Sequence, residues 1–76
     1  MKQVSEMPTS GQFVAVWSLN GAPWSAAYKS ETMCCKWESG RLNVYSIFDD
    51  EWEKVEHPAS LKNHLSINNA SYYVAD

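Results

Sequence analysis

What the sequence lacks excludes several classes of protein. No apolar run approaches the roughly 20 residues of a transmembrane helix, and residues 1–8 contain no hydrophobic stretch typical of a secretory signal. The only cysteines of the 76-residue chain are Cys34 and Cys35, which are adjacent. Small secreted domains usually carry several spaced cysteines in disulfides. The sequence therefore predicts a cytoplasmic protein with free thiols and no membrane partner.

Motifs for catalysis and cofactor binding are also missing. The chain has no phosphate-binding loop, no dinucleotide-binding glycine pattern and no nucleophile elbow. Cys34, Cys35, His57 and His64 could in principle bind zinc, but structural zinc sites use spaced cysteine and histidine pairs. No pattern connects Cys34 to a histidine that would activate its thiol. We expect no enzyme activity, no cofactor and no metal.

Positive charge is scarce. Six Lys and Arg residues stand against nine Asp and Glu residues, giving a net charge of −3. Lys and Arg supply most of the affinity of proteins for nucleic acid and for anionic membranes. The charge balance therefore disfavours nucleic acid as a partner and favours a larger protein, with a basic surface complementary to this acidic chain.

Aromatic residues are abundant, with four Trp, four Tyr and two Phe. Each buries about 150–250 Å² when fully packed, and a domain of this size buries only about 60% of its unfolded surface. Some of these rings should therefore stay partly exposed. They could simply cover a sheet, or they could anchor a binding interface, and the sequence leaves both interpretations open.

The first predicted hairpin joins residues 13–19 to residues 24–29 through Asn20-Gly21. This dipeptide favours a type I′ turn, because both central residues need a positive φ. The register pairs aromatic residues across the two strands: Trp17 with Trp24, and Phe13 with Tyr28.

A second hairpin is predicted from residues 33–38 and 41–48, with Ser39-Gly40 as its loop. In this register Glu38 faces Arg41 as an ion pair and Cys35 faces Val44, so polar and apolar pairs separate onto two faces. Asp49-Asp50 then turns the chain into residues 51–56, a charged strand that we expect at an exposed edge of the sheet.

The period changes after His57-Pro58. Ser60 can cap a short helix in which Leu61, His64 and Leu65 share a face, and Asn68-Asn69 ends it. Residues 70–75 could form a final short strand or a tail packed on the sheet.

The predicted fold is mainly β, a single small domain of antiparallel hairpins with about five strands. Because both faces of residues 41–48 carry apolar side chains, the sheet should curl, form a small open barrel, or be covered by the short C-terminal helix. Residues 1–11 lack periodicity and are predicted to form a flexible N-terminal arm, and residues 12–76 the β-rich domain.

The candidate binding site surrounds one aromatic residue. Carboxylates gather around Trp52, and Ile47 is expected to lie opposite it. An aromatic anchor within a polar rim is typical of a binding hot spot, and the exposed edge could add to a partner's sheet. The alternative is that Trp52 closes the core while the acids keep the edge soluble. The acidic residues of this candidate site are Asp49, Asp50, Glu51, Glu53 and Glu56.

Two functions follow from these features. The first is a small protein-binding module, an adaptor or an inhibitor that blocks a larger macromolecule, in the style of phage and mobile-element accessory proteins. The alternative is an aromatic platform on a small barrel that binds single-stranded nucleic acid or oligosaccharide. The identity of the partner and the oligomeric state, including a homo-oligomer, stay open.

The free thiols can be tested directly. Denatured protein that has never been reduced should take up two equivalents of a thiol reagent per chain, because adjacent cysteines on a strand point to opposite faces. Uptake of none would contradict the cytoplasmic prediction, and stoichiometric zinc in the purified protein would contradict the expected absence of metal.

Overall fold

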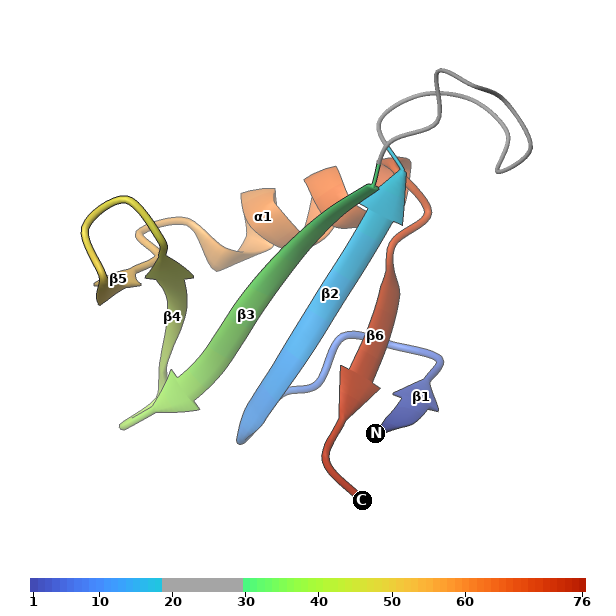
Figure 1. The fold of residues 1–76 in the computed structure, drawn as a ribbon, viewed down its shortest axis with the longest axis horizontal. Coiled ribbons are helices and arrows are strands. Elements are labelled where there is room, and N and C mark those ends of the chain that lie inside the picture. Colours follow the sequence, from blue (N-terminus) through green and yellow to red (C-terminus); the bar gives the residue numbers. More distant parts are fainter. Residues whose placement is uncertain (19–29) are drawn as a thin grey trace.

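The computed structural model describes residues 1–18 and 30–76. Within these residues, six strands form one open antiparallel sheet in the order β1-β6-β2-β3-β4-β5 (Figure 1), with one helix, α1, against it. The elements are β1 (Lys2–Val4), β2 (Gln12–Ser18), β3 (Ser30–Glu38), β4 (Arg41–Ser46), β5 (Glu51–Lys54), α1 (Pro58–Ile67) and β6 (Ser71–Val74). The predicted mainly β fold with a short helix near the C-terminus is confirmed.

β2 lies in the interior of the sheet. Its alternate residues Phe13, Ala15 and Trp17 are buried at 1%, 0% and 9% exposure, as expected for a strand with one face on the core. Phe13 lies opposite Cys35 of β3 on one side and opposite Val74 of β6 on the other. The predicted pairing of Phe13 with Tyr28 is therefore wrong, because both neighbours of this position are distant in sequence. The rest of that hairpin prediction, with the Asn20-Gly21 turn, lies outside the described residues.

The hairpin of β3 and β4 follows its prediction. Cys35 lies opposite Val44 and Glu38 opposite Arg41, and Ser39 and Gly40 adopt φ values of 54° and 75°, as a type I′ turn requires. The predicted ion pair is wrong in its partner, since the Glu38 carboxylate instead contacts Lys36 Nζ at 3.0 Å. Lys36 is on the same face of the same strand, so this contact needs no rearrangement across the hairpin.

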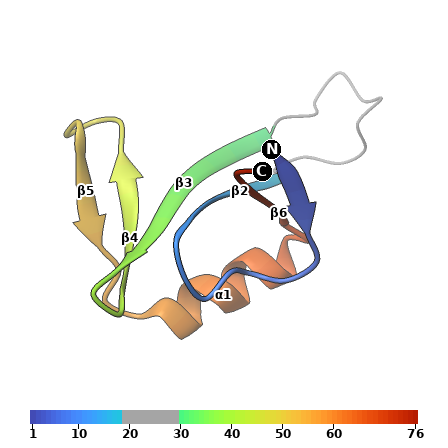
Figure 2. The same cartoon turned by 90° about the horizontal axis from the view of Figure 1, so that it is seen from below.

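The helix covers one face of the sheet (Figure 2). Leu65 is fully buried, Leu61 packs against the core, and His64 lies edge-on to Trp17 with 6.1 Å between ring centroids. The shared face of these three residues is confirmed. The expected cap at Ser60 is wrong, because the helix begins at Pro58 with His57 as N-cap. Proline favours the first helical turn, where its fixed φ suits the helix and its missing N–H costs nothing.

The two ends of the chain pair with each other. β6, predicted as one of two alternatives, lies between β1 and β2. Residues 1–11, for which the sequence predicts a flexible arm, contribute β1 to the sheet edge and the side chain of Met7 to the core. The carbonyl of Pro8 accepts a 2.9 Å hydrogen bond from Trp37 Nε1. The contacts of this segment are irregularly spaced, which is why no strand period indicates them.

The open sheet has β1 and β5 as its edges, and it does not close into the small barrel that was one predicted form. No helix in the described ranges 1–18 and 30–76 is long and apolar enough to cross a membrane.

The role of α1 in the core can be tested with two alanine variants of one helix. Leu65→Ala removes a fully buried side chain and should lower the free energy of unfolding by about 2–5 kcal/mol. Ile67→Ala is the matched control, because Ile67 is 71% exposed, and it should change stability by about 0.5 kcal/mol or less. Equal thermal midpoints for the two variants would contradict the observed packing.

Candidate interaction surface

The candidate site occupies the hairpin of β4 and β5, which forms one edge of the sheet. Ser46 lies opposite Glu51 and Tyr45 opposite Trp52, so residues 47–50 form the connecting turn. The turn therefore begins two residues before the predicted Asp49-Asp50. The expected pairing of Ile47 with Trp52 is wrong, because Ile47 has already left the strand.

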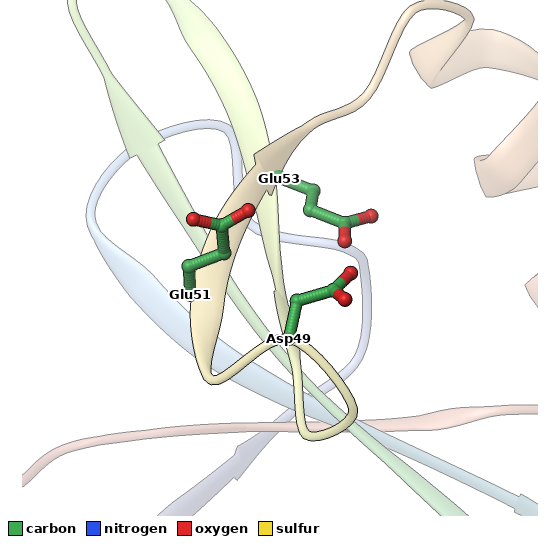
Figure 3. Close-up of side chains that lie close together, drawn as sticks. All are labelled: Asp49, Glu51 and Glu53. Atoms are coloured by element: carbon green, nitrogen blue, oxygen red, sulfur yellow. The ribbon is translucent and has the colours of Figure 1, made fainter.

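Three of the predicted acidic residues come together. Asp49 in the turn and Glu51 and Glu53 on β5 have carboxylate oxygens within 4.8 Å of one another, and all three side chains are exposed (Figure 3). Glu51 and Glu53 share a face because strand side chains alternate. Asp49 joins them where its side chain contacts Ser46, whose Oγ lies 3.4 Å from Asp49 Oδ2 and accepts from the Asp49 N–H at 3.3 Å.

The electrostatics of this acidic cluster, Asp49, Glu51 and Glu53, are unfavourable when every member is ionised. The pKa of Glu53 is raised, chiefly by a side-chain hydrogen bond with Asp49, and further by desolvation and by repulsion from Asp49 and Glu51. A hydrogen bond from Ser46 opposes the shift. A cation, whether a metal ion or a Lys or Arg side chain, would relieve this repulsion.

Trp52 lies on the opposite face of β5 from the acidic cluster. Its ring packs edge-on against Tyr45, with 5.5 Å between centroids. Lys36 Nζ lies 4.4 Å from the ring centroid, within the range of a cation–π contact. Trp52 is half-buried. The expected ring of carboxylates around Trp52 is therefore wrong, because the pleat separates the indole from Glu51 and Glu53.

The remaining two acidic residues of the predicted site lie outside the cluster. The Asp50 carboxylate accepts a hydrogen bond from the Tyr45 hydroxyl, which raises the pKa of Tyr45. Asp50 has a φ of 54° and completes the turn. Glu56 is exposed in the segment between β5 and α1. The structure thus divides the predicted site into three parts. The acidic cluster is one, Trp52 with Tyr45 and Asp50 is the second, and Glu56 stands apart from both.

Sequence reasoning missed the most exposed apolar pair beside this cluster. Ile47 and Phe48 are 79% and 93% exposed at the tip of the hairpin. Both belong to residues 41–48, which the sequence predicts as a strand, and the signal against this is Asp49-Asp50 directly after them. They line part of a cleft of about 300 Å³ between this tip and β3.

The four residues weighed as a metal or nucleophile site are not gathered for either role. Cys34 is exposed and Cys35 is buried, on opposite faces of β3. Burial, with a smaller contribution from Cys34, raises the pKa of Cys35 to about 12, so its thiol is protonated and weakly nucleophilic at neutral pH. His57 occupies the N-cap position of α1 without a side-chain hydrogen bond to the helix, and His64 packs on Trp17.

Comparisons of the chain with known protein families, with curated proteins and with solved structures found no match.

The raised pKa of Glu53 gives the acidic cluster a pH signature. A carboxyl with a raised pKa in the folded state favours folding fully only below its unfolded pKa, ordinarily about 4.3, and this stability is lost as pH rises through the folded pKa. Glu53→Gln should therefore raise the thermal midpoint near neutral pH and change it little at about pH 3. Glu56→Gln, a carboxylate outside the cluster, should show no such pH-dependent gain. Identical pH profiles would contradict the repulsion.

Proposed function

We propose that this domain is a protein-binding module, an adaptor or inhibitor that occupies a basic surface of a larger protein through the tip of its β4–β5 hairpin. The observation that carries the proposal is the exposure of Ile47 and Phe48, 79% and 93%, at adjacent positions. Exposed apolar groups that gather together, unlike scattered ones, mark interaction surfaces.

The surroundings of this pair match the composition of protein interfaces. The acidic cluster begins at Asp49, directly after Phe48, so an apolar centre is bordered on one side by negative charge. Interfaces commonly place apolar and aromatic groups at the centre and polar groups at the rim. A basic partner surface would gain contact with the carboxylates and relieve the repulsion from Asp49 and Glu51, which adds to the hydrogen bond with Asp49 and to desolvation in raising the pKa of Glu53. Charge of this kind adds mainly association rate and specificity.

Trp52 takes a different role in this proposal from that of a central anchor. Its ring is held between Tyr45 and Lys36 on the outer face, where it stiffens the hairpin that presents the tip. The hairpin is an edge of the sheet, and a single pair of strands is only marginally stable in water. Packing of Trp52 on Tyr45 therefore supports the presentation of Ile47 and Phe48.

The same proposal includes a cellular compartment and a biological role. Cys34 and Cys35 are free thiols, which suits a reducing compartment such as the cytoplasm. A small chain that blocks a larger macromolecule by occupying its surface needs no catalytic group of its own. Such a chain fits the role of an accessory protein of a phage or mobile element.

The proposal predicts the loss of a partner without loss of fold. Wild-type protein should capture a partner from a lysate of its native host, and the double variant Ile47→Ser, Phe48→Ser should capture it at least about tenfold less well, as for a hot-spot anchor. Ile67→Ser removes a comparably exposed apolar group from the helix and should bind as wild type. All three proteins should keep the same thermal midpoint within a few degrees.

Two results would overturn the proposal. Equal capture by the double variant and by Ile67→Ser would show that the hairpin tip is not the anchor. The second result is partner capture that changes neither in the double variant Glu51→Lys, Glu53→Lys nor on addition of salt. It would show that the acidic residues do not contribute to binding, because steering by charge depends on ionic strength.

A further inference from the structure

β3 is longer than β4 beside it, and among the described residues part of its edge on that side has no paired strand. β2 pairs with residues Ser30–Lys36 of β3, whereas β4 pairs only with Cys35–Glu38. From Val44 onward β4 continues in register with β5 and diverges from β3 (Figure 1). Within residues 1–18 and 30–76, no strand is in register with Glu31–Cys34 on the side of β4.

The backbone of this segment faces the gap at Thr32 and at Cys34. The N–H of Trp37 donates to the Gly11 carbonyl, on the side of β2, at 2.9 Å. Backbone groups of successive strand residues point to alternate edges, so the N–H and C=O of Thr32, like those of Cys34, point away from β2. Thr32 is exposed and offers both a donor and an acceptor to an added strand.

Side chains beside this edge form an apolar floor. The cleft of about 300 Å³ lies between β3 and the hairpin tip. Met33 and Val44 project to the core face, where both pack against the core, and Trp17 and Phe48 also line the cleft. An apolar side chain of an added strand, placed opposite Met33, would point into this space because strand side chains alternate.

The charges at the cleft are negative at both ends. Glu31, exposed, lines it on β3, two residues from Met33 and on the same face. Ser46 lines it on β4 and contacts Asp49 of the acidic cluster. A Lys or Arg two residues before or after the apolar side chain would share its face and reach one of these carboxylates.

We propose that this cleft binds an extended segment of a partner protein, which adds as a strand to the Glu31–Cys34 edge of β3. The segment carries an apolar residue flanked, at alternate positions, by Lys or Arg. Strand addition of this kind takes affinity from backbone hydrogen bonds and specificity from alternate side chains. The inference rests on the proposed function and names the kind of partner that the hairpin tip and the acidic cluster engage.

A second copy of the chain fits this cleft poorly. Two copies would bring two Glu31 carboxylates and two acidic clusters toward one interface, and each chain has a net charge of −3. Like charges across an interface are unfavourable. A basic segment would instead be attracted to Glu31 and to the acidic cluster.

The test uses isotope-labelled protein and a short capped peptide in which lysine, valine and lysine alternate with threonine. Binding should shift the amide resonances of Thr32, Met33 and Val44 and slow hydrogen exchange at Thr32. The same peptide with glutamate in place of lysine should bind at least about tenfold more weakly. A peptide methylated at the backbone nitrogens that face β3 should lose the protection at Thr32.

Two variants of the edge separate the backbone contact from the side chain. Thr32→Pro removes the outward N–H, a change that an unpaired edge tolerates, and should abolish the protection and weaken binding at least about tenfold. Thr32→Val keeps the backbone donor and should bind as wild type. If Thr32→Pro fails to fold, binding of the methylated peptide to wild-type protein tests the same backbone hydrogen bonds.

The remaining outcomes decide between this inference and the broader proposal. Shifts confined to residues 47–53, with no protection at Thr32, would overturn strand addition and leave the hairpin tip as the contact. Absence of any binding at millimolar peptide, or concentration-dependent dimerisation that protects Thr32 without peptide, would also overturn it. The proposed function is tested by a different measurement. It fails if the Ile47→Ser, Phe48→Ser variant captures the partner as well as wild type does.

Discussion

Burial of one face of β2 is the constraint on which the rest of the structure depends. Phe13, Ala15 and Trp17 point to the same side and are covered by α1 and its flanking segments. A helix can cover that side only if strands lie on both edges of β2, because an unpaired buried edge would leave backbone groups without partners. β3 and β6 satisfy these edges, and β6 in turn carries β1. The two ends of the chain are thereby fixed together.

The same core explains why β4 leaves β3. Leu42 is fully buried and Val44 packs against the core, whereas Ser46, two residues further on the same face, contacts the carboxylate of Asp49 in the turn. Beyond Val44 there is little apolar surface to hold β4 against β3, and pairing with β5 continues instead. The cleft and the exposed tip at Ile47 and Phe48 follow from this divergence. The proposed binding surface is thus a consequence of where the core ends.

The charges of the β4–β5 hairpin are divided between its two faces. On one face Lys36 contacts both Glu38 and the ring of Trp52, so its charge is neutralised within the domain. On the other face Asp49, Glu51 and Glu53 lie close to one another and to the hydroxyl of Ser46, and no ion pair reaches them within residues 1–18 and 30–76. The acidic cluster therefore lies on the face to which Glu31 and Met33 of β3 also project, beside the apolar tip.

The sequence by itself determined the elements whose signals are local. The Ser39-Gly40 turn sets the register of β3 and β4 through its positive φ angles, and the spacing of Leu61, His64 and Leu65 sets the buried face of α1. Long-range pairing was decided only by the tertiary structure: Phe13 takes Cys35 and Val74 as neighbours, and no turn residue specifies strands distant in sequence. The candidate site divides in the same way. Its acidic composition was readable from residues 49–56, but the separation of Trp52 from Glu51 and Glu53 and the exposure of Phe48 depend on the pleat and on where β4 leaves the core.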